Sequence, residues 1–188
     1  MDKALLRDRL RSRLQALTIE QREAKSGRAC RNLVSTLAFQ EASVIMIFLS
    51  LPDEVDTRPA IEAAWDENKT VLVPKIVWSD RHLEPIKLDS LNEAWDGSDS
   101  GLRWPQEAVI WDLARINLVV TPGLGFDRAG HRLGRGGAFY DRFFGQAGLQ
   151  ATRCGFGFDE QLVEVVPTAG HDQPVDLVVT DEQTVIRK

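Results

Sequence analysis

The sequence has few of the residues that mark secreted, membrane-spanning or metal-thiolate proteins. Its two cysteines, Cys30 and Cys154, lie far apart and lack metal-ligand spacing. The longest apolar stretch, Val44 to Leu51, is interrupted by Ser50 and is far too short to span a bilayer. The polar start Met1-Asp2-Lys3 lacks the pattern of a secretory signal. These absences predict a cytoplasmic protein with reduced, buried thiols and no membrane partner.

Composition is ordinary for a globular chain. Hydrophobic residues make up 43% and charged residues 27% of the 188 positions, which excludes disordered and fibrous classes. The sequence contains no internal repeat and no low-complexity tract. Residues 89 to 106, rich in small polar residues, are expected to form a loop and not a linker between domains. We therefore expect a single domain over residues 1–188.

Charge is uneven along the chain. Met1 to Arg31 holds nine Lys and Arg against four Asp and Glu, a net charge of +5; the whole chain is −5, so the remainder is −10. A basic helix could bind RNA or a membrane surface. However, four leucines form an apolar stripe at helical spacing, so packing alone accounts for the helix; they are Leu6, Leu10, Leu14 and Leu17. Nucleic acid is therefore not expected as a partner.

Apolar runs typical of strands alternate with helical segments. The strand-like runs are Val44 to Leu49, Thr70 to Pro74, Leu83 to Leu88, Ile116 to Thr121, Arg153 to Phe158 and Val175 to Thr180. Thr18-x-x-Gln21 is a capping box that predicts a helix to about Leu37, Asp56 or Thr57 can cap a helix over residues 60–65, and a further helix is expected at Ala138 to Phe144. This alternation predicts a layered α/β domain with parallel strands. Ligands of such sheets gather beyond the carboxyl ends of the strands.

Thr121 to Asp141 is the stretch most suited to binding a ligand. Its 21 residues contain six glycines and three arginines, directly after an apolar run. Glycines allow close approach of the backbone, and arginines donate in forks that match phosphate oxygens. Neither the Walker nor the dinucleotide-binding pattern is met, and a long surface loop would also use glycines for turns. Arginine, tyrosine and aspartate at the junction with the next helix favour a phosphate site; they are Arg132, Arg135, Tyr140 and Asp141.

Lys3 and Arg7 lie four residues apart on one face of the first helix. They could reach a common anion if the start of this helix packs near the glycine-rich loop. Otherwise they are two solvated charges.

In order and spacing, these motifs resemble the 5-formyltetrahydrofolate cyclo-ligase (methenyltetrahydrofolate synthetase) family over the whole chain. The matching segments are Lys3-x-x-x-Arg7, Phe48-Leu49-Ser50, Glu54-Val55-Asp56-Thr57, Pro74, Pro122 to Asp127, Gly130-x-Arg132-Leu133-Gly134-x-Gly136, Tyr140-Asp141, His171-Asp172 and Val175-Asp176. The resemblance implies a three-layer α/β/α fold around a mainly parallel sheet, similar to sugar-phosphate isomerases and coenzyme A transferases. It also implies ATP- and Mg²⁺-dependent cyclisation of 5-formyltetrahydrofolate to 5,10-methenyltetrahydrofolate by a monomer.

The resemblance also assigns roles to residues. ATP would contact Lys3, Arg7, Arg132, Leu133, Gly134, Arg135, Gly136, Gly137 and Tyr140. The folate substrate would contact Leu49, Glu54, Arg135, Gly136, Gly137, Ala138 and Phe139. Arg135, with Arg132, would stabilise the transition state, and Asp141 and Asp176 would hold Mg²⁺. Taken alone, Asp141 could be a charge at a helix start, Asp176 part of a turn at a strand end, and Glu54 a solvated side chain.

The chain departs from the family pattern in the loop. Ala138 stands where the family usually has glycine, which restricts positive φ angles and adds a methyl group where substrate approaches. Phe139 lacks the hydroxyl of the tyrosine found in some relatives, and Gly137 replaces a lysine found in others. A non-catalytic nucleotide- or folate-binding paralogue and an RNA-associated protein are therefore the alternative functions.

Overall fold

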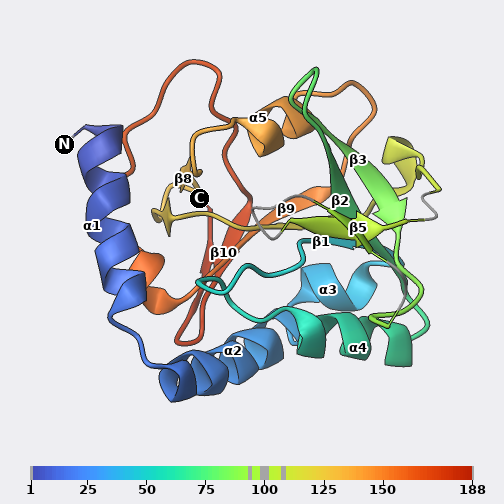
Figure 1. Ribbon diagram of the computed structural model, residues 1–188, viewed down its shortest axis with the longest axis horizontal. Coiled ribbons are helices and arrows are strands. Elements are labelled where there is room, and N and C mark those ends of the chain that lie inside the picture. The colour runs from blue at the N-terminus through green and yellow to red at the C-terminus, as the bar shows by residue number, and fades with distance from the viewer. Residues whose placement is uncertain (1, 93–94, 98–101, 107–108, 188) are drawn as a thin grey trace.

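The computed structural model describes residues 2–92, 95–97, 102–106 and 109–187. Its centre is a seven-stranded sheet in the order β11-β10-β9-β6-β1-β2-β3 (Figure 1). The strands are β1 Val44–Ile47, β2 Thr70–Val77, β3 His82–Lys87, β6 Leu118–Thr121, β9 Thr152–Phe156, β10 Leu177–Val179 and β11 Thr184–Ile186. The inner strands β10, β9, β6, β1 and β2 run parallel, whereas β3 and β11 are antiparallel edges. The predicted mainly parallel sheet is confirmed.

The central strands are continuous apolar runs because both of their faces are covered. All four residues of β1 are buried, and so are all four of β6. Successive side chains of a strand point to opposite faces, and accordingly Ile45 and Ile47 join one core cluster while Met46 joins the other. Ile45 pairs with Leu118 across the two strands.

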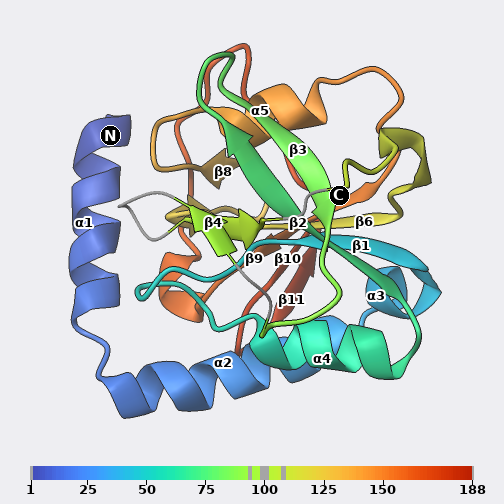
Figure 2. The same ribbon diagram turned by 45° about the vertical axis from the view of Figure 1, so that its right-hand side comes forward.

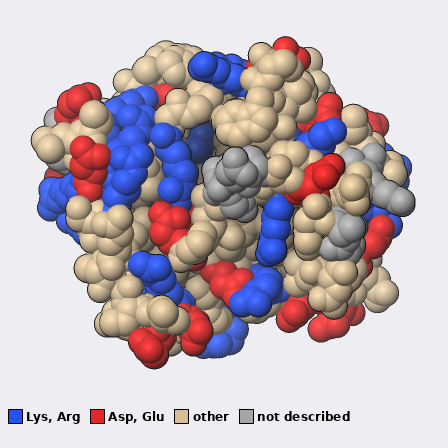
Figure 3. Space-filling view, viewed as in Figure 1, with Lys and Arg blue, Asp and Glu red and all other residues tan. Residues whose placement is uncertain are grey.

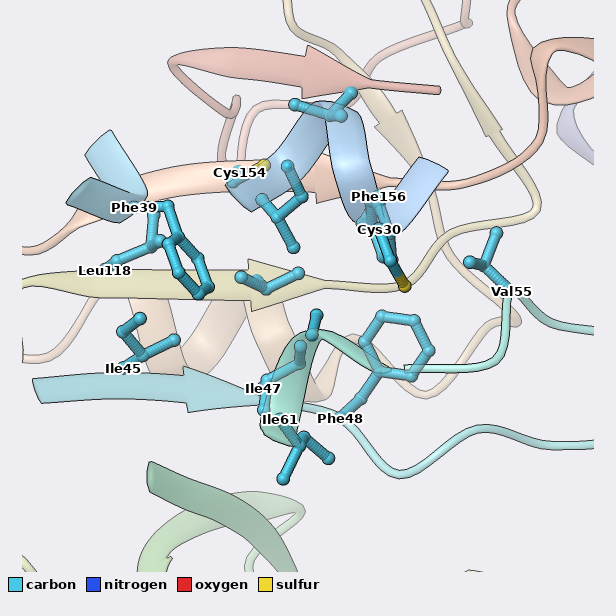
Figure 4. Packing of buried hydrophobic residues seen from close by; sticks show 14 of the residues in the cluster. Cys30, Phe39, Ile45, Ile47, Phe48, Val55, Ile61, Leu118, Cys154 and Phe156 are labelled. Carbon is cyan, nitrogen blue, oxygen red and sulfur yellow. The ribbon is translucent and has the colours of Figure 1, made fainter. Parts of the chain in front are cut away.

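Helices cover both faces of the sheet. One face carries α2 Ile19–Val34, α3 Leu37–Glu41 and α4 Arg58–Asp66, and α5 Phe139–Phe144 lies on the other (Figure 1). Figure 4 shows Cys30, Ile61 and Phe156 among the side chains that fill the larger of the two cores. The arrangement is the expected three-layer α/β/α fold. No helix within the described ranges is long and apolar enough to cross a membrane.

Both cysteines are buried as free thiols, as expected. Burial raises the pKa of the Cys30 thiol to about 12, and it raises the pKa of Cys154 as well. Because the thiolate is the reactive form, both side chains act as small apolar core residues.

Local capping explains where the helices begin. The side chain of Thr18 accepts a hydrogen bond from Gln21 N, and the Gln21 side chain accepts one from Thr18 N, so the capping box is confirmed. Helix α2 ends at Val34, and Thr36 caps the separate short helix α3 by accepting from Phe39 N. At α4, Asp56 accepts from Arg58 N, whereas the Thr57 hydroxyl donates to the Phe48 carbonyl.

Helix α1 Lys3–Gln15 stands at one side of the sheet, as Figures 1 and 2 show. Its buried leucines Leu6 and Leu10 pack against Leu133 and Val166 in a small separate cluster. Leu14 instead joins the larger core. The leucine stripe is therefore used for packing, as its spacing predicted.

Some short elements were not predicted from the sequence. The glycine-rich loop folds into an antiparallel pair, β7 Gly125–Phe126 and β8 Arg132–Leu133, and residues 89–106 contain a second pair, β4 Trp95–Gly97 and β5 Arg103–Pro105. Two 3₁₀ turns, η1 Leu113–Arg115 and η2 Asp159–Gln161, complete the structure. Strands of two or three residues carry too little periodicity to be recognised in a sequence.

Candidate functional site

A pocket of about 340 Å³ opens at the carboxyl ends of β1 and β6 and beside the β2–β3 hairpin. Its lining residues are Phe48, Leu49, Leu51, Glu54, Pro74, Ile76, Trp78, Leu83, Leu102, Arg103, Pro122, Gly123, Arg132, Gly134, Arg135, Gly137, Ala138, Phe139, Tyr140 and Asp141. Figure 3 shows a hollow in this face of the molecule, with Lys and Arg side chains gathered beside it. The position agrees with the rule for ligand sites in open α/β sheets.

Arg132 is a buried cation in the lining of the pocket. Its side chain is only 4% exposed, and its Nη2 donates to Asp141 Oδ2 at 3.0 Å. The guanidinium also lies over the ring of Tyr140, 5.5 Å from the centroid. Its Nε is buried without a hydrogen-bond partner among the described residues. Because Arg132 lines the pocket, its guanidinium places a positive charge beside any anion that enters.

Asp141 and Tyr140 are held at the start of α5. The second oxygen of Asp141, Oδ1, accepts from Gln173 N at 3.1 Å. Burial raises the pKa of the Tyr140 phenol above its ordinary value of 10. Tyr140 is therefore a neutral surface that faces the arginine, and not a base.

Arg135 lies at the outer edge of the pocket and spans its mouth. Its side chain is 40% exposed, and its Nη2 donates to Asp53 Oδ1 at 2.7 Å and to Glu54 Oε1 at 3.1 Å. The contact joins the glycine-rich loop to the segment that follows β1. Glu54 is 8% exposed, whereas Arg135 and Asp53 remain partly solvated, at 40% and 32% exposed. Because a solvated ion pair contributes little to stability, Arg135 can leave Asp53 when an anion enters.

Glu54 is the buried acid of the site. Burial raises the pKa of its carboxyl above the ordinary value of 4.5, although the hydrogen bond from Leu51 N and the charge of Arg135 act in the opposite direction. Its side chain is 8% exposed. The solvated alternative for Glu54 therefore does not hold.

The backbone of the loop is strained where the sequence departs from the family pattern. Ala138 has φ 53° and ψ 25°, in the left-handed region, directly before α5. This conformation costs a non-glycine residue about 1–2 kcal/mol. A Cβ on the preceding Gly137 would lie 2.5 Å from Cε2 of Phe139, so a larger residue there would require that ring to turn. The loop thus keeps its shape with alanine in a position that favours glycine.

The start of α1 packs on the glycine-rich loop, which is the condition for a shared anion site. Arg7 Nε donates to the Gly134 carbonyl at 2.9 Å, and Lys3 Nζ donates to Asp172 Oδ2 at 2.5 Å. Although burial acts to raise it, the hydrogen bonds from Lys3 and Ala169 N lower the pKa of Asp172. Lys3 and Arg7 border the loop but do not line the pocket.

The structure brings most of the predicted site residues together. Those that line the pocket are Leu49, Glu54, Arg132, Gly134, Arg135, Gly137, Ala138, Phe139, Tyr140 and Asp141. Gly136 does not line it, and the Leu133 side chain packs against α1 instead.

Asp176, like Lys3, Arg7, Leu133 and Gly136, is not among the residues that line the pocket. It directly precedes β10, at the amino end of that strand, and its Oδ2 accepts from Arg153 N at 2.8 Å. The structure therefore does not place Asp176 beside Asp141 in the pocket wall. Nor do the described ranges contain a cluster of three or more His, Cys, Asp or Glu side chains that could hold a metal ion.

Sequence reasoning missed the wall that the β2–β3 hairpin contributes. We expected β2 to end at Pro74, but it continues to Val77, and Ile76, Trp78 and Leu83 all line the pocket. The signal was present, because Ile76 and Trp78 are two positions apart and thus on one face of an extended chain. Asp172 and Gln173, which hold Lys3 and Asp141, were also not assigned a role.

Comparisons with known proteins identify the family of the chain. The family model described as "5-formyltetrahydrofolate cyclo-ligase family" matches residues 1–181. A relative named 5-formyltetrahydrofolate cyclo-ligase from Escherichia coli (strain K12) is 32% identical over 181 residues, which is 91% of this chain and 96% of the relative. Its namesake from Mus musculus is 29% identical over 188 residues, covering 94% and 92%.

A solved structure has the same fold. The NMR structure of Aquifex aeolicus 5,10-methenyltetrahydrofolate synthetase superimposes with a TM-score of 0.85 at 24% identity, over 99% of this chain and 93% of that one.

Proposed function

The chain belongs to the 5-formyltetrahydrofolate cyclo-ligase family, and on that premise we propose that it converts 5-formyltetrahydrofolate to 5,10-methenyltetrahydrofolate, using ATP and Mg²⁺ and releasing ADP and phosphate. The observation that carries the proposal is Arg132, a buried cation paired with Asp141 in the wall of a largely apolar pocket. Such a pocket suits an uncharged ring system that must meet a phosphate group.

The chemistry needs positioning more than a protein nucleophile. A formamide oxygen is a poor leaving group. Transfer of the terminal phosphoryl group forms a bond from the formyl oxygen to phosphorus and breaks the bond to ADP. The neighbouring folate nitrogen N10 then attacks the activated carbon and passes its proton to the departing phosphate, which carries the former formyl oxygen. Holding both reactants in one pocket makes this second step intramolecular.

Arg132 and Arg135 have different roles toward the transferred phosphoryl group. Arg132, fixed by Asp141, receives the phosphate oxygens at the base of the pocket. Arg135 leaves Asp53 and Glu54 and turns to the charge that develops on the phosphoryl group, where such a donor accelerates transfer. Lys3 and Arg7, at the other side of the loop, neutralise the remaining phosphates.

Asp141 is the carboxylate that fits a magnesium site. Mg²⁺ is commonly held by one or two carboxylates together with substrate phosphates and water, and Asp141 lines the pocket beside Arg132. When bound, the ion would neutralise charge on the phosphate oxygens. Asp176 lies outside the pocket lining and is not included in this site.

Glu54 and the apolar residues around it bind the folate. The Glu54 carboxyl accepts hydrogen bonds from the amino-pyrimidine edge of the pterin, and Leu49 and Phe139 contact its flat faces. We also propose that the protein acts as a monomer in the cytoplasm, without nucleic acid.

The test is a reaction of purified protein with 5-formyltetrahydrofolate, ATP and Mg²⁺, in which methenyl-folate absorbance and ADP release are followed together. We expect both products in equal amounts and none without ATP.

Asp141→Asn should abolish turnover, whereas Asp66→Asn, on the exposed end of α4, serves as the matched control. Asp176→Asn should keep turnover. A loss of turnover in this variant would indicate that Asp176 belongs to the metal site. Binding of ATP with no methenyl product would instead support the non-catalytic paralogue.

A further inference from the structure

Trp78 is an exposed aromatic side chain at the mouth of the pocket. It directly follows β2 and is 55% exposed. The other described apolar side chains that line the pocket are buried or half-buried, and only Trp78 is exposed. A core position would not leave an indole in water, so packing of the sheet does not account for it.

Trp78 is nevertheless held in place. Its ring meets that of Phe139 edge to face, with centroids 5.4 Å apart and an interplanar angle of 89°. Ile76 and Leu83 from the same hairpin line the pocket with them. These four residues, named the hairpin wall, form an apolar part of the pocket lining. An edge-to-face aromatic pair can accept a third ring against its open face.

Three of the four residues of the hairpin wall come from the β2–β3 hairpin, and Phe139 comes from the start of α5. The phosphate-binding groups lie on the glycine-rich loop next to α1, through the Arg7 to Gly134 contact. In Figure 1, α1 lies at the left of the molecule and the β2–β3 hairpin at the upper right. A nucleotide whose phosphates face α1 therefore leaves the hairpin wall to the other substrate.

We propose that Trp78 and Phe139 bind the aminobenzoyl ring of the folate, an inference that rests on the proposed function. The formyl group must meet the phosphate near Arg132 and Arg135, which draws the pterin inward. The aminobenzoyl ring, joined to the pterin through a methylene group and N10, then extends from the reacting atoms toward the mouth. At the mouth the flat apolar surface available to it is the indole of Trp78.

The experiment measures equilibrium binding to the full chain by calorimetry. The ligands are 5-formyltetrahydrofolate, a 5-formyltetrahydropterin that lacks the aminobenzoylglutamate, and a non-hydrolysable ATP analogue. Trp78→Ala should raise the Kd for the full folate about tenfold, as expected for loss of one aromatic stacking partner, and leave the Kd values for the pterin and the ATP analogue unchanged. Trp78→Phe should restore most of the affinity.

Ile186→Ala is the matched control, because it removes an exposed apolar side chain, 73% exposed, from the far edge strand β11. In steady-state assays, Trp78→Ala should raise the KM for the folate and leave kcat and the KM for ATP near those of the wild type.

Three results would overturn the assignment. An unchanged folate Kd in Trp78→Ala would remove the contact; an equal loss for the truncated pterin would move it to the pterin; and weaker binding of the ATP analogue would assign the wall to adenine. If the wild-type protein bound the ATP analogue but neither folate ligand, both this inference and the proposed function would fail. If the wild-type protein turned over normally and Trp78→Ala left the folate Kd unchanged, this inference alone would be wrong.

Discussion

Arg132 and Arg135 lie three positions apart in one loop, but the fold places them in different surroundings. Arg132, at the base of the loop, is 4% exposed and paired with Asp141. Arg135, at its outer edge, is 40% exposed and paired with Asp53 and Glu54. A buried charge depends on its partner, whereas the pair that Arg135 forms with the partly exposed Asp53 is solvated and held weakly. We therefore expect Arg132 to stay in place when substrates bind and Arg135 to move.

Replacing Arg132 should produce the largest effect on stability. Arg132→Ala leaves Asp141 without its cation in a mostly buried position, so we expect the free energy of unfolding to fall by about 3 kcal/mol. Urea unfolding followed by circular dichroism measures it. Arg128→Ala, which removes an exposed arginine of the same loop, should change stability by less than about 0.5 kcal/mol. Equal stability of the two variants would show that the buried pair contributes nothing.

Replacing Arg135 should separate activity from stability. We expect Arg135→Ala to lower kcat by about 10²–10³-fold, because a donor to the transition state is lost. The free energy of unfolding should change by less than about 1 kcal/mol. Single-turnover kinetics with both substrates saturating, together with urea unfolding, checks this. A loss of stability as large as that of Arg132→Ala would contradict the difference drawn between the two arginines.

The buried carboxyl of Glu54 makes the stability of the protein depend on pH. Burial raises the pKa of Glu54 above 4.5 in the folded protein. The folded state then favours the protonated form, so the contribution of Glu54 to stability is full below pH 4.5 and is lost as pH rises through the folded pKa. Glu54→Gln cannot ionise, and its stability relative to the wild type should therefore increase with pH above 4.5. A difference that stays constant between pH 4 and pH 8 would refute this.

The smallest effect is expected at the strained residue between the arginines and α5. Ala138→Gly relieves a left-handed conformation at φ 53°, and we expect it to raise the free energy of unfolding by about 0.5–1 kcal/mol, since added freedom in the unfolded chain offsets part of the relief. Ala169→Gly, at an exposed loop position without positive φ, should instead be neutral or destabilising. The comparison fails if both variants shift the urea midpoint in the same direction.

Local signals in the sequence predicted much of the fold. The Thr18 and Gln21 capping box forms as expected, and the apolar runs at β1 and β6 are buried strands. Boundaries were less accurate where a signal is shared by neighbouring elements: the helix expected to reach Leu37 ends at Val34, because Thr36 caps a new turn there. Asp176 was assigned by its position in a motif, and that position says nothing of which end of a strand faces the pocket.

The sequence by itself determined the chemistry available: a glycine-rich loop with three arginines, an aspartate at its end, and an order of motifs that identifies the family. Tertiary structure alone decided which groups meet. Glu54 and Arg135 are 81 residues apart and share a hydrogen bond, and Trp78 reaches Phe139 only because β2 pairs with β3 beyond the edge that was expected. Propensities and caps act over a few residues, so they can be read along the chain. Contacts between distant segments depend on how the sheet and its layers pack.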